Sequence, residues 1–199
     1  MFKFLERLRR QRLSNKRLPD RRRWGRAKSY RKSWGKRSEV AAALVPDGAR
    51  VLEIGVGIGH FRDQVKGRCS YLGADLNPLE AETLRLDLDS DALPVGPFDY
   101  LVALGVLEYL HRPGEAIAKI AVACDNAVIS YCCLRDRALN DEIKADRRER
   151  GWVSDLTPAD LERHFADHGH FVRTVEDISS PEQPYWELLF QFCRRAMPE

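Results

Sequence analysis

The chain has 199 residues, of which 44% are apolar, so it can bury one sizeable core but has no room for a second globular domain. No apolar run approaches the roughly 18 residues that a membrane-spanning helix needs. The five cysteines have no C-x-x-C or metal-ligand spacing, which argues against a disulfide framework and favours a reducing, cytoplasmic compartment.

The net charge of +3 conceals an asymmetry along the chain. Residues 1–37 hold sixteen Lys and Arg against two acids, whereas residues 38–199 hold 17 basic residues against 28 acidic ones. We therefore expect a basic, partly helical N-terminal arm over residues 1–37 and a single folded domain over residues 38–199. The sequence leaves the oligomeric state open.

The arm suits several partners. One helical face, with arginines around it, holds Met1, Phe4, Leu5 and Leu8, a pattern typical of a helix lying on an anionic membrane surface, where the protein would be peripheral. The Arg-Arg-Arg-Trp cluster at residues 21–24 would instead suit the phosphates of a nucleic acid. Two further interpretations stay open: a solvated tail that folds against the acidic body, and an organelle-targeting segment.

The stretch from Val51 to Phe61 predicts a buried strand, a turn with three glycines, and a helix that begins near Ile58. Glycines at every second position let the backbone approach a ligand that a Cβ would repel. The spacing is G-x-G-x-G, and His60 stands where a dinucleotide-binding turn would have its last glycine, which argues against NAD. The sequence therefore predicts a loop for a different nucleotide cofactor.

These residues resemble the first motif of class I S-adenosylmethionine-dependent methyltransferases, in which an acidic residue and one further residue precede G-x-G-x-G. Glu53, Gly55, Gly57 and Gly59 fill this pattern. The resemblance implies that they bind S-adenosylmethionine. It also implies an α/β fold of the Rossmann-like three-layer type, with a mostly parallel seven-stranded sheet and an antiparallel last strand.

A second short strand ends in Asp75, about 20 residues beyond the glycine loop, where an acid accepts hydrogen bonds from both ribose hydroxyls. Eight residues separate Asp75 from Leu84, where the third strand begins. A parallel crossover usually takes about 10–12 residues, so the second helix, starting near Asn77, should be short.

The same resemblance implies which residues contact the adenine and methionine parts of the cofactor. The acid after the third strand, Asp87, with the backbone of Leu88, would contact the adenine edge, and Asp89 and Asp91 are its rivals. Both rivals also fit a solvated, turn-forming loop. The end of the fourth strand, which includes Leu104, would pass beneath the methionine part of the cofactor.

The C-terminal third continues the alternation of strands and helices. Residues 127–132 predict a fifth strand, and Thr157 opens a helix with a capping-box pattern and proline at its first position. Gly169 ends that helix. Residues 170–178 and 185–194 predict two successive strands joined by a short turn.

The acceptor site is less well marked. A sulfonium carries an activated methyl group, so alignment and exclusion of water matter more than a strong base. A hydroxyl acceptor would gain from a general base beyond the carboxyl ends of the strands. His111 and Tyr131 are the candidate catalytic residues, His111 because of its titration range. The alternative to a catalytic role is, for His111, a polar residue in a helix-ending turn and, for Tyr131, a buried aromatic residue at the end of a strand. No metal is expected, because His164, His168 and His170 lack an accompanying ligand pattern.

The sequence as a whole predicts an S-adenosylmethionine-dependent methyltransferase that acts on an oxygen or nitrogen of a small-molecule or sugar-containing acceptor. One alternative is an RNA or other nucleic-acid methyltransferase that uses the basic arm. Against it, the Asn/Asp-Pro-Pro-aromatic run of amino-methylating nucleic-acid enzymes is absent at residues 104–107. The other alternative is a non-catalytic, cofactor-binding scaffold protein.

Overall fold

Seven strands of the described chain form one sheet in the order β3-β2-β1-β4-β5-β7-β6. The computed structural model describes residues 2–15, 34–134, 141–179 and 185–195. The strands are β1 (Arg50–Ile54), β2 (Ser70–Asp75), β3 (Leu84–Arg85), β4 (Tyr100–Leu104), β5 (Asn126–Cys133), β6 (His170–Asp177) and β7 (Trp186–Arg194).

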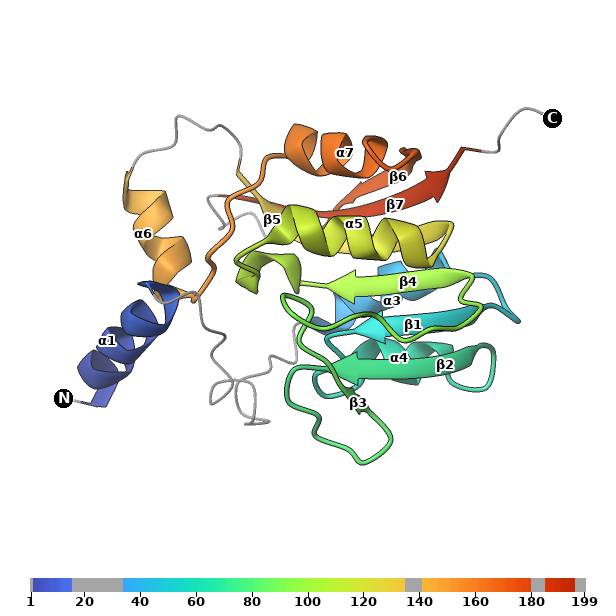
Figure 1. Ribbon diagram of the computed structural model, residues 1–199, viewed down its shortest axis with the longest axis horizontal. Helices are drawn as coiled ribbons and strands as arrows, with labels where there is room; N and C mark the ends of the chain where they lie inside the picture. The colour runs from blue at the N-terminus through green and yellow to red at the C-terminus, as the bar shows by residue number, and fades with distance from the viewer. Residues whose placement is uncertain (1, 16–33, 135–140, 180–184, 196–199) are drawn as a thin grey trace.

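All strand pairs are parallel except those made by β7, which runs antiparallel to both β5 and β6. This topology confirms the prediction of a mostly parallel seven-stranded sheet with an antiparallel last strand. It also places the carboxyl ends of β1, β2, β4 and β5 along one edge of the sheet, toward which the arrow of β4 points in Figure 1.

Helices cover both faces of the sheet (Figure 1). One face carries α3 (Gly35–Ala43) and α4 (His60–Val65), and the other carries α5 (Pro113–Ala123) and α7 (Pro158–Ala166). A short 3-10 helix, η3 (Leu107–Tyr109), follows β4. Among the described residues, α1 (Phe2–Asn15) and α6 (Asp141–Glu149) lie together beyond the carboxyl edge of the sheet.

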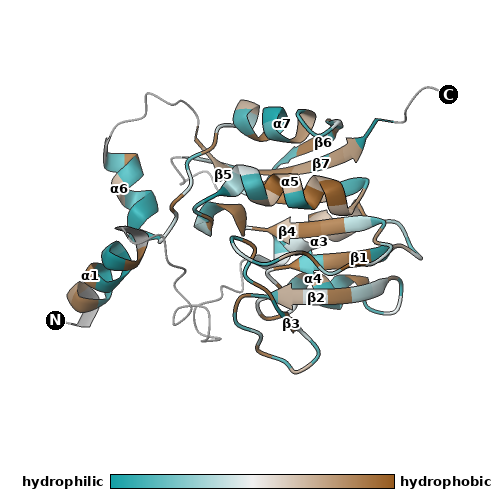
Figure 2. Cartoon of the chain, viewed as in Figure 1, coloured by the Kyte–Doolittle hydropathy of each residue, from teal (hydrophilic) through white to brown (hydrophobic). Residues whose placement is uncertain are grey.

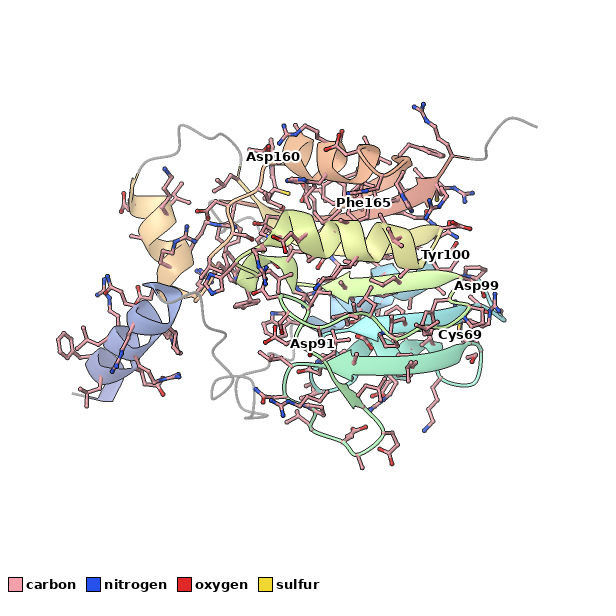
Figure 3. All side chains as sticks on the ribbon, viewed as in Figure 1. Cys69, Asp91, Asp99, Tyr100, Asp160 and Phe165 are labelled. Atoms are coloured by element: carbon pink, nitrogen blue, oxygen red, sulfur yellow. The ribbon has the colours of Figure 1, made fainter. Side chains whose placement is uncertain are left out.

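The strands are buried on both faces, so their side chains divide between two hydrophobic cores. Leu52 and Leu101 point toward α5 and α7, where Phe165 stacks on Phe192 with ring centroids 3.8 Å apart. Val51 and Val102 point the other way, toward α3 and α4. Figure 2 shows the apolar residues concentrated along the central strands, and Figure 3 labels Phe165 beneath α7.

The capped helix of the C-terminal third is confirmed. Thr157 and Asp160 form a capping box at the start of α7: the Thr157 hydroxyl accepts from the Asp160 N–H at 3.2 Å, and the Asp160 carboxylate accepts from the Thr157 N–H at 3.0 Å. Proline occupies the first turn of the helix, where its missing N–H costs nothing.

One local expectation was wrong, and two others are refined by the structure. The short second helix near Asn77 is absent: residues 76–83 form bends and turns, because eight residues are too few for a helical crossover and the Asn77 N–H bonds the Asp75 carboxylate in a turn. The helix after the glycine loop begins at His60, since Ile58 still belongs to the turn. His111 lies between the end of η3 and Pro113, the first residue of α5.

Two further points concern membrane-spanning helices and the predicted domain boundary. No helix among the described residues is long and apolar enough to cross a membrane. Helix α3 spans residues 35–43 and therefore crosses the predicted boundary at residue 37, which stays a prediction.

Candidate functional site

The ends of β1, β2 and β4 meet at the carboxyl edge of the sheet. Ile54, the last residue of β1, pairs with Ala74 on one side and with Ala103 on the other. The residues that follow these positions, Gly55 and Asp75, therefore emerge side by side. Parallel sheets bind ligands at this edge.

The glycine loop leaves β1 in a conformation that L side chains avoid. Gly55, Gly57 and Gly59 have φ angles of +84°, +58° and +83°. A Cβ on Gly55 would also lie 2.5 Å from Cγ2 of Val106, which follows β4. Glycine is thus required both by the backbone and by the close approach of the neighbouring strand end.

Asp75 ties this loop to the end of β2. Its carboxylate accepts hydrogen bonds from the Gly57 N–H at 3.0 Å and from the Asn77 N–H at 2.9 Å. The side chain is buried, and burial raises the pKa of Asp75, although the N–H groups of Gly57 and Asn77 offset part of that shift. The structure brings the predicted ribose acid and the glycine loop into direct contact.

Glu53 lies beneath the loop. It is 2% exposed and its carboxylate accepts a hydrogen bond from the Tyr71 hydroxyl of β2. Burial raises the pKa of Glu53 to about 8, while the bond from Tyr71 acts in the opposite direction. Its observed contact braces β1 against β2, and a direct contact with the cofactor stays a prediction.

The acids after β3 have distinct surroundings. Asp87 is nearly buried, and its carboxylate accepts from the Asp89 N–H at 3.3 Å. Leu88 packs into the core, and its carbonyl accepts from Lys119 Nζ at 2.8 Å. The side chain of Leu88 therefore packs into the core, and the adenine contact of Asp87 and the backbone of Leu88 stays a prediction.

The two rival acids serve the protein itself. The Asp89 carboxylate accepts from the N–H groups of His111 and Arg112, at 3.1 and 3.2 Å, just before α5. The Asp91 carboxylate accepts from the Asp87 N–H at 2.8 Å. Figure 3 shows Asp91 near the carboxyl edge, whereas Asp99 lies at the opposite edge, where it pairs with Arg50 at 2.6 Å.

Arg37, which the sequence did not single out, lies against the end of β4. Leu104 is buried against α3 and α4, and Gly105 follows it with a φ of +67°. A Cβ on Gly105 would lie 2.8 Å from Nη1 of Arg37. Arg37 also pairs with Glu187 of β7 at 3.0 Å. By composition Arg37 belonged to the basic arm, so only the fold reveals that its guanidinium lies at the end of β4.

Four buried polar atoms near this edge lack a hydrogen-bond partner among the described residues: Nε of Arg37, Nε2 of His60, Oε2 of Glu108 and Oγ of Ser130. Burial raises the pKa of Glu108, while the N–H of Cys132 and the charges of Arg37 and Arg147 oppose that shift. Since buried polar groups are nearly always satisfied, these atoms are candidates for a contact with ordered water or a bound ligand.

The Tyr131 hydroxyl is surrounded by hydrogen-bonding groups of the protein itself. It is fully buried, and its hydroxyl lies 2.8 Å from Ser154 Oγ and accepts from the Leu156 N–H at 3.1 Å and from Arg147 Nη2 at 3.3 Å. Burial raises the pKa of Tyr131 well above its ordinary value, against the charge of Arg147. The Tyr131 oxygen is thus engaged within the core, and a catalytic role for this residue stays a prediction.

Arg147, which donates to the Tyr131 hydroxyl, is itself held in the core by several contacts. It is fully buried although it comes from the highly charged helix α6, and it donates to the Cys132 carbonyl at 2.6 Å, to the Ser154 carbonyl at 2.8 Å and to Asp155 at 2.8 Å. Its guanidinium also lies 4.9 Å from the centre of the Trp152 ring. Arg147 fastens α6 to the carboxyl end of β5.

His111 lies half-buried between η3 and α5, held through its N–H by Asp89. A catalytic role for this histidine stays a prediction. Near the C-terminus, His170 lies with its ring nitrogens 3.1 Å from the Cys124 carbonyl and 3.2 Å from the His168 carbonyl. Across the described ranges, no group of three or more His, Cys, Asp or Glu side chains is arranged to hold a metal ion.

Comparisons with known proteins agree with this geometry. A family model described as a methyltransferase domain matches residues 24–175. No curated protein matches the chain. A magnesium protoporphyrin IX methyltransferase from Synechocystis, solved with bound S-adenosylhomocysteine, shares 16% identity over 81% of this chain and 83% of that one, with a TM-score of 0.62.

Two other solved structures are similar. An S-adenosylmethionine-dependent methyltransferase from Mesorhizobium loti shares 19% identity over 78% of this chain and 96% of that one, with a TM-score of 0.61. The [4+2]-cyclase SpnF shares 13% identity over 80% of each chain, with a TM-score of 0.63. At these identities the likeness concerns the fold alone.

The chain belongs to the methyltransferase domain family, because the family model covers most of its length. This membership confirms the resemblance drawn from the glycine loop: the protein is a class I S-adenosylmethionine-dependent methyltransferase. The individual cofactor contacts stay predictions.

Proposed function

We propose that the protein transfers a methyl group from S-adenosylmethionine to an oxygen or nitrogen of a small-molecule or sugar-containing acceptor. The observation that carries this proposal is the hydrogen bond from the Gly57 N–H to the Asp75 carboxylate, at 3.0 Å. It joins a loop that admits a ligand close to its backbone with an acid suited to two ribose hydroxyls.

The proposed cofactor contacts follow the carboxyl edge. Asp75 would accept from the ribose, Asp87 would meet the adenine, and the backbone around Gly105 would border the methionine part. Arg37 would bind the methionine carboxylate, because its guanidinium lies against Gly105 and a guanidinium binds a carboxylate through two parallel hydrogen bonds. When bound, S-adenosylmethionine supplies an activated methyl group, so the protein's task is to align the acceptor and exclude water.

An aromatic cluster supports an acceptor site beside the cofactor. Trp152 and Tyr185 are buried with their ring centroids 5.0 Å apart in an edge-to-face contact, and Tyr109 packs against them. Rings of this kind favour a flat or partly apolar small molecule. The Synechocystis relative, which is named for magnesium protoporphyrin IX, is an example of a small-molecule acceptor in this fold.

The cofactor assignment is tested by calorimetry with S-adenosylmethionine and S-adenosylhomocysteine. Asp75→Ala should weaken binding by about 1 to 3 kcal/mol through lost charge-assisted hydrogen bonds. The matched control is Asp63→Ala, since Asp63 is an exposed acid on α4 that pairs with Arg62. Equal affinity of the Asp75→Ala, Asp63→Ala and unaltered proteins would refute the ribose assignment.

The acceptor class is tested by methyl transfer from labelled cofactor to pools of hydroxyl-bearing and amine-bearing small molecules, sugar-containing ones among them. If the acceptor is a hydroxyl and His111 is its base, His111→Gln should lower kcat by about 10²- to 10⁴-fold. Cofactor binding without transfer to any pool would favour the alternative of a non-catalytic, cofactor-binding protein.

Methylation of RNA is the second candidate, and the sixteen basic residues of the arm favour it. Its signature would be a salt-sensitive shift of labelled RNA together with methyl transfer to that RNA. A shift without transfer would leave the small-molecule proposal as the better account.

A further inference from the structure

Helix α1 has its apolar side facing outward. The side chains of Phe4, Leu5 and Leu8 are 62%, 57% and 48% exposed. The half-buried residues lie on the opposite side at helical spacing, and they are mostly polar: Glu6, Arg9, Arg10 and Leu13. A surface helix of a globular protein ordinarily buries its apolar stripe against the core, so the arrangement in α1 is the reverse of the usual one.

This orientation is held by contacts with the body of the protein. Arg10 donates to the Glu149 carbonyl at the end of α6, at 2.8 Å, and lies 3.5 Å from Glu6 one turn away. Helix α6 is in turn fastened to the end of β5 by Arg147. Figures 1 and 2 show α1 beside α6, with apolar residues on the part that projects away from the sheet.

The charges around the apolar residues define the surface that they suit. Arg7 and Arg12 are exposed: Arg7 lies beside the outward apolar residues, and Arg12 lies one turn beyond Leu8 on the same face. The arm that contains them, residues 1–37, carries sixteen basic side chains against two acids. Apolar side chains flanked by arginines match the boundary between lipid tails and anionic headgroups.

We propose that the outward face of α1, formed by Phe4, Leu5, Leu8, Arg7 and Arg12, docks the protein on the surface of a membrane that contains anionic lipid. The apolar side chains enter the interface and the arginines contact the lipid headgroups. Because α1 and α6 lie beyond the carboxyl edge of the sheet, docking brings that edge close to the membrane. A nucleic acid fits this face less well, since phosphates offer nothing to three exposed apolar side chains. The proposal is independent of the acceptor.

The test is sedimentation of the full chain with vesicles of phosphatidylcholine alone, and of phosphatidylcholine and phosphatidylglycerol in equal parts. We expect binding to the anionic vesicles, much weaker binding to the neutral ones, and release as salt is raised. Phe4→Ser/Leu5→Ser/Leu8→Ser should weaken binding at least tenfold. Arg7→Gln/Arg12→Gln should weaken it by about 25-fold, about fivefold for each arginine.

A matched control removes apolar residues that are exposed elsewhere. Val95, Val122 and Val175 are 104%, 77% and 43% exposed and lie far from α1 in the chain. Val95→Ser/Val122→Ser/Val175→Ser should bind anionic vesicles like the unaltered protein. Thermal unfolding of each variant, followed by circular dichroism, checks that the fold is kept.

Three outcomes would overturn the proposal. The first is equal binding of the α1 serine variant and the unaltered protein to anionic vesicles. The second is a labelled-RNA shift that Arg7→Gln/Arg12→Gln abolishes and the serine variant keeps, without any vesicle binding. The third is a dimer in light scattering that the serine variant converts to monomer, again without vesicle binding, because the face would then be covered by a second copy.

Discussion

Gly55 offers a sharp test of how the glycine loop is built, because two separate costs meet at this residue. Its φ of +84° is strained for any L side chain, at about 1–2 kcal/mol. A Cβ would also lie 2.5 Å from Cγ2 of Val106, well inside the ordinary contact distance. Overpacking of this kind costs about 1–3 kcal/mol. Gly55→Ala should therefore destabilise the protein by about 2–5 kcal/mol in total.

Gly48 provides the matched control. Its φ of +80° is nearly the same, and a Cβ there would meet nothing within 4 Å. Gly48→Ala should cost only the backbone part, about 1–2 kcal/mol. Both free energies of unfolding are measured by urea denaturation followed by tryptophan fluorescence.

A double-mutant cycle separates the two costs at Gly55. In a Val106→Ala background Cγ2 is gone, so Gly55→Ala should fall to the cost of Gly48→Ala. If Gly55→Ala and Gly48→Ala cost the same in the unaltered background, the steric part of the reasoning is refuted. If the excess cost survives Val106→Ala, the wrong contact has been identified.

Three further predictions concern other buried groups. Because the pKa of Glu53 rises from 4.5 to about 8 in the fold, the protein should lose stability as pH rises from 4.5 through 8. Glu53→Gln should reduce this loss by about 3–5 kcal/mol, measured by urea titrations across that pH range. Parallel stability curves for the variant and the unaltered protein would contradict the prediction. Thr157→Ala should cost about 1 kcal/mol by removing the cap of α7, whereas Thr157→Ser should keep most of it. Arg147→Met should cost about 3–5 kcal/mol of unfolding free energy by leaving Asp155 and the carbonyls of Cys132 and Ser154 without their buried partner, and it should speed proteolysis within α6. The matched control is Arg148→Met, which changes an exposed neighbour and should cost about 1 kcal/mol or less. Equal losses in the two variants would argue against the buried network.

The sequence predicted those features whose causes are local. An apolar run interrupted by Glu53 and followed by alternating glycines is enough to specify β1 and its loop. A strand buried on both faces needs the apolar run, and a closely bound ligand needs the glycines. Thr157 and Asp160 specify the start of α7 in the same way, because a capping box involves only the first turn of the helix.

The features that the sequence did not predict depend on distant partners. Arg147 looks like a solvated charge in a helix with few apolar residues, and its burial follows only from Cys132, Ser154 and Asp155 converging on it. Arg37 likewise counts as one more basic residue until the fold sets it against Gly105. Long-range convergence of polar groups leaves no periodic trace in a sequence.

The position of β7 between β5 and β6 has a consequence for the order of folding. β6 precedes β7 in the chain but pairs with no other strand among the described residues, so it has no place in the sheet until β7 is available. During synthesis the outer flank of β5 stays open in the meantime, and open strand edges invite pairing with other chains. A ribosome that stalls before residue 186 should therefore release an aggregation-prone fragment, even though every strand of the glycine-loop half has already been made.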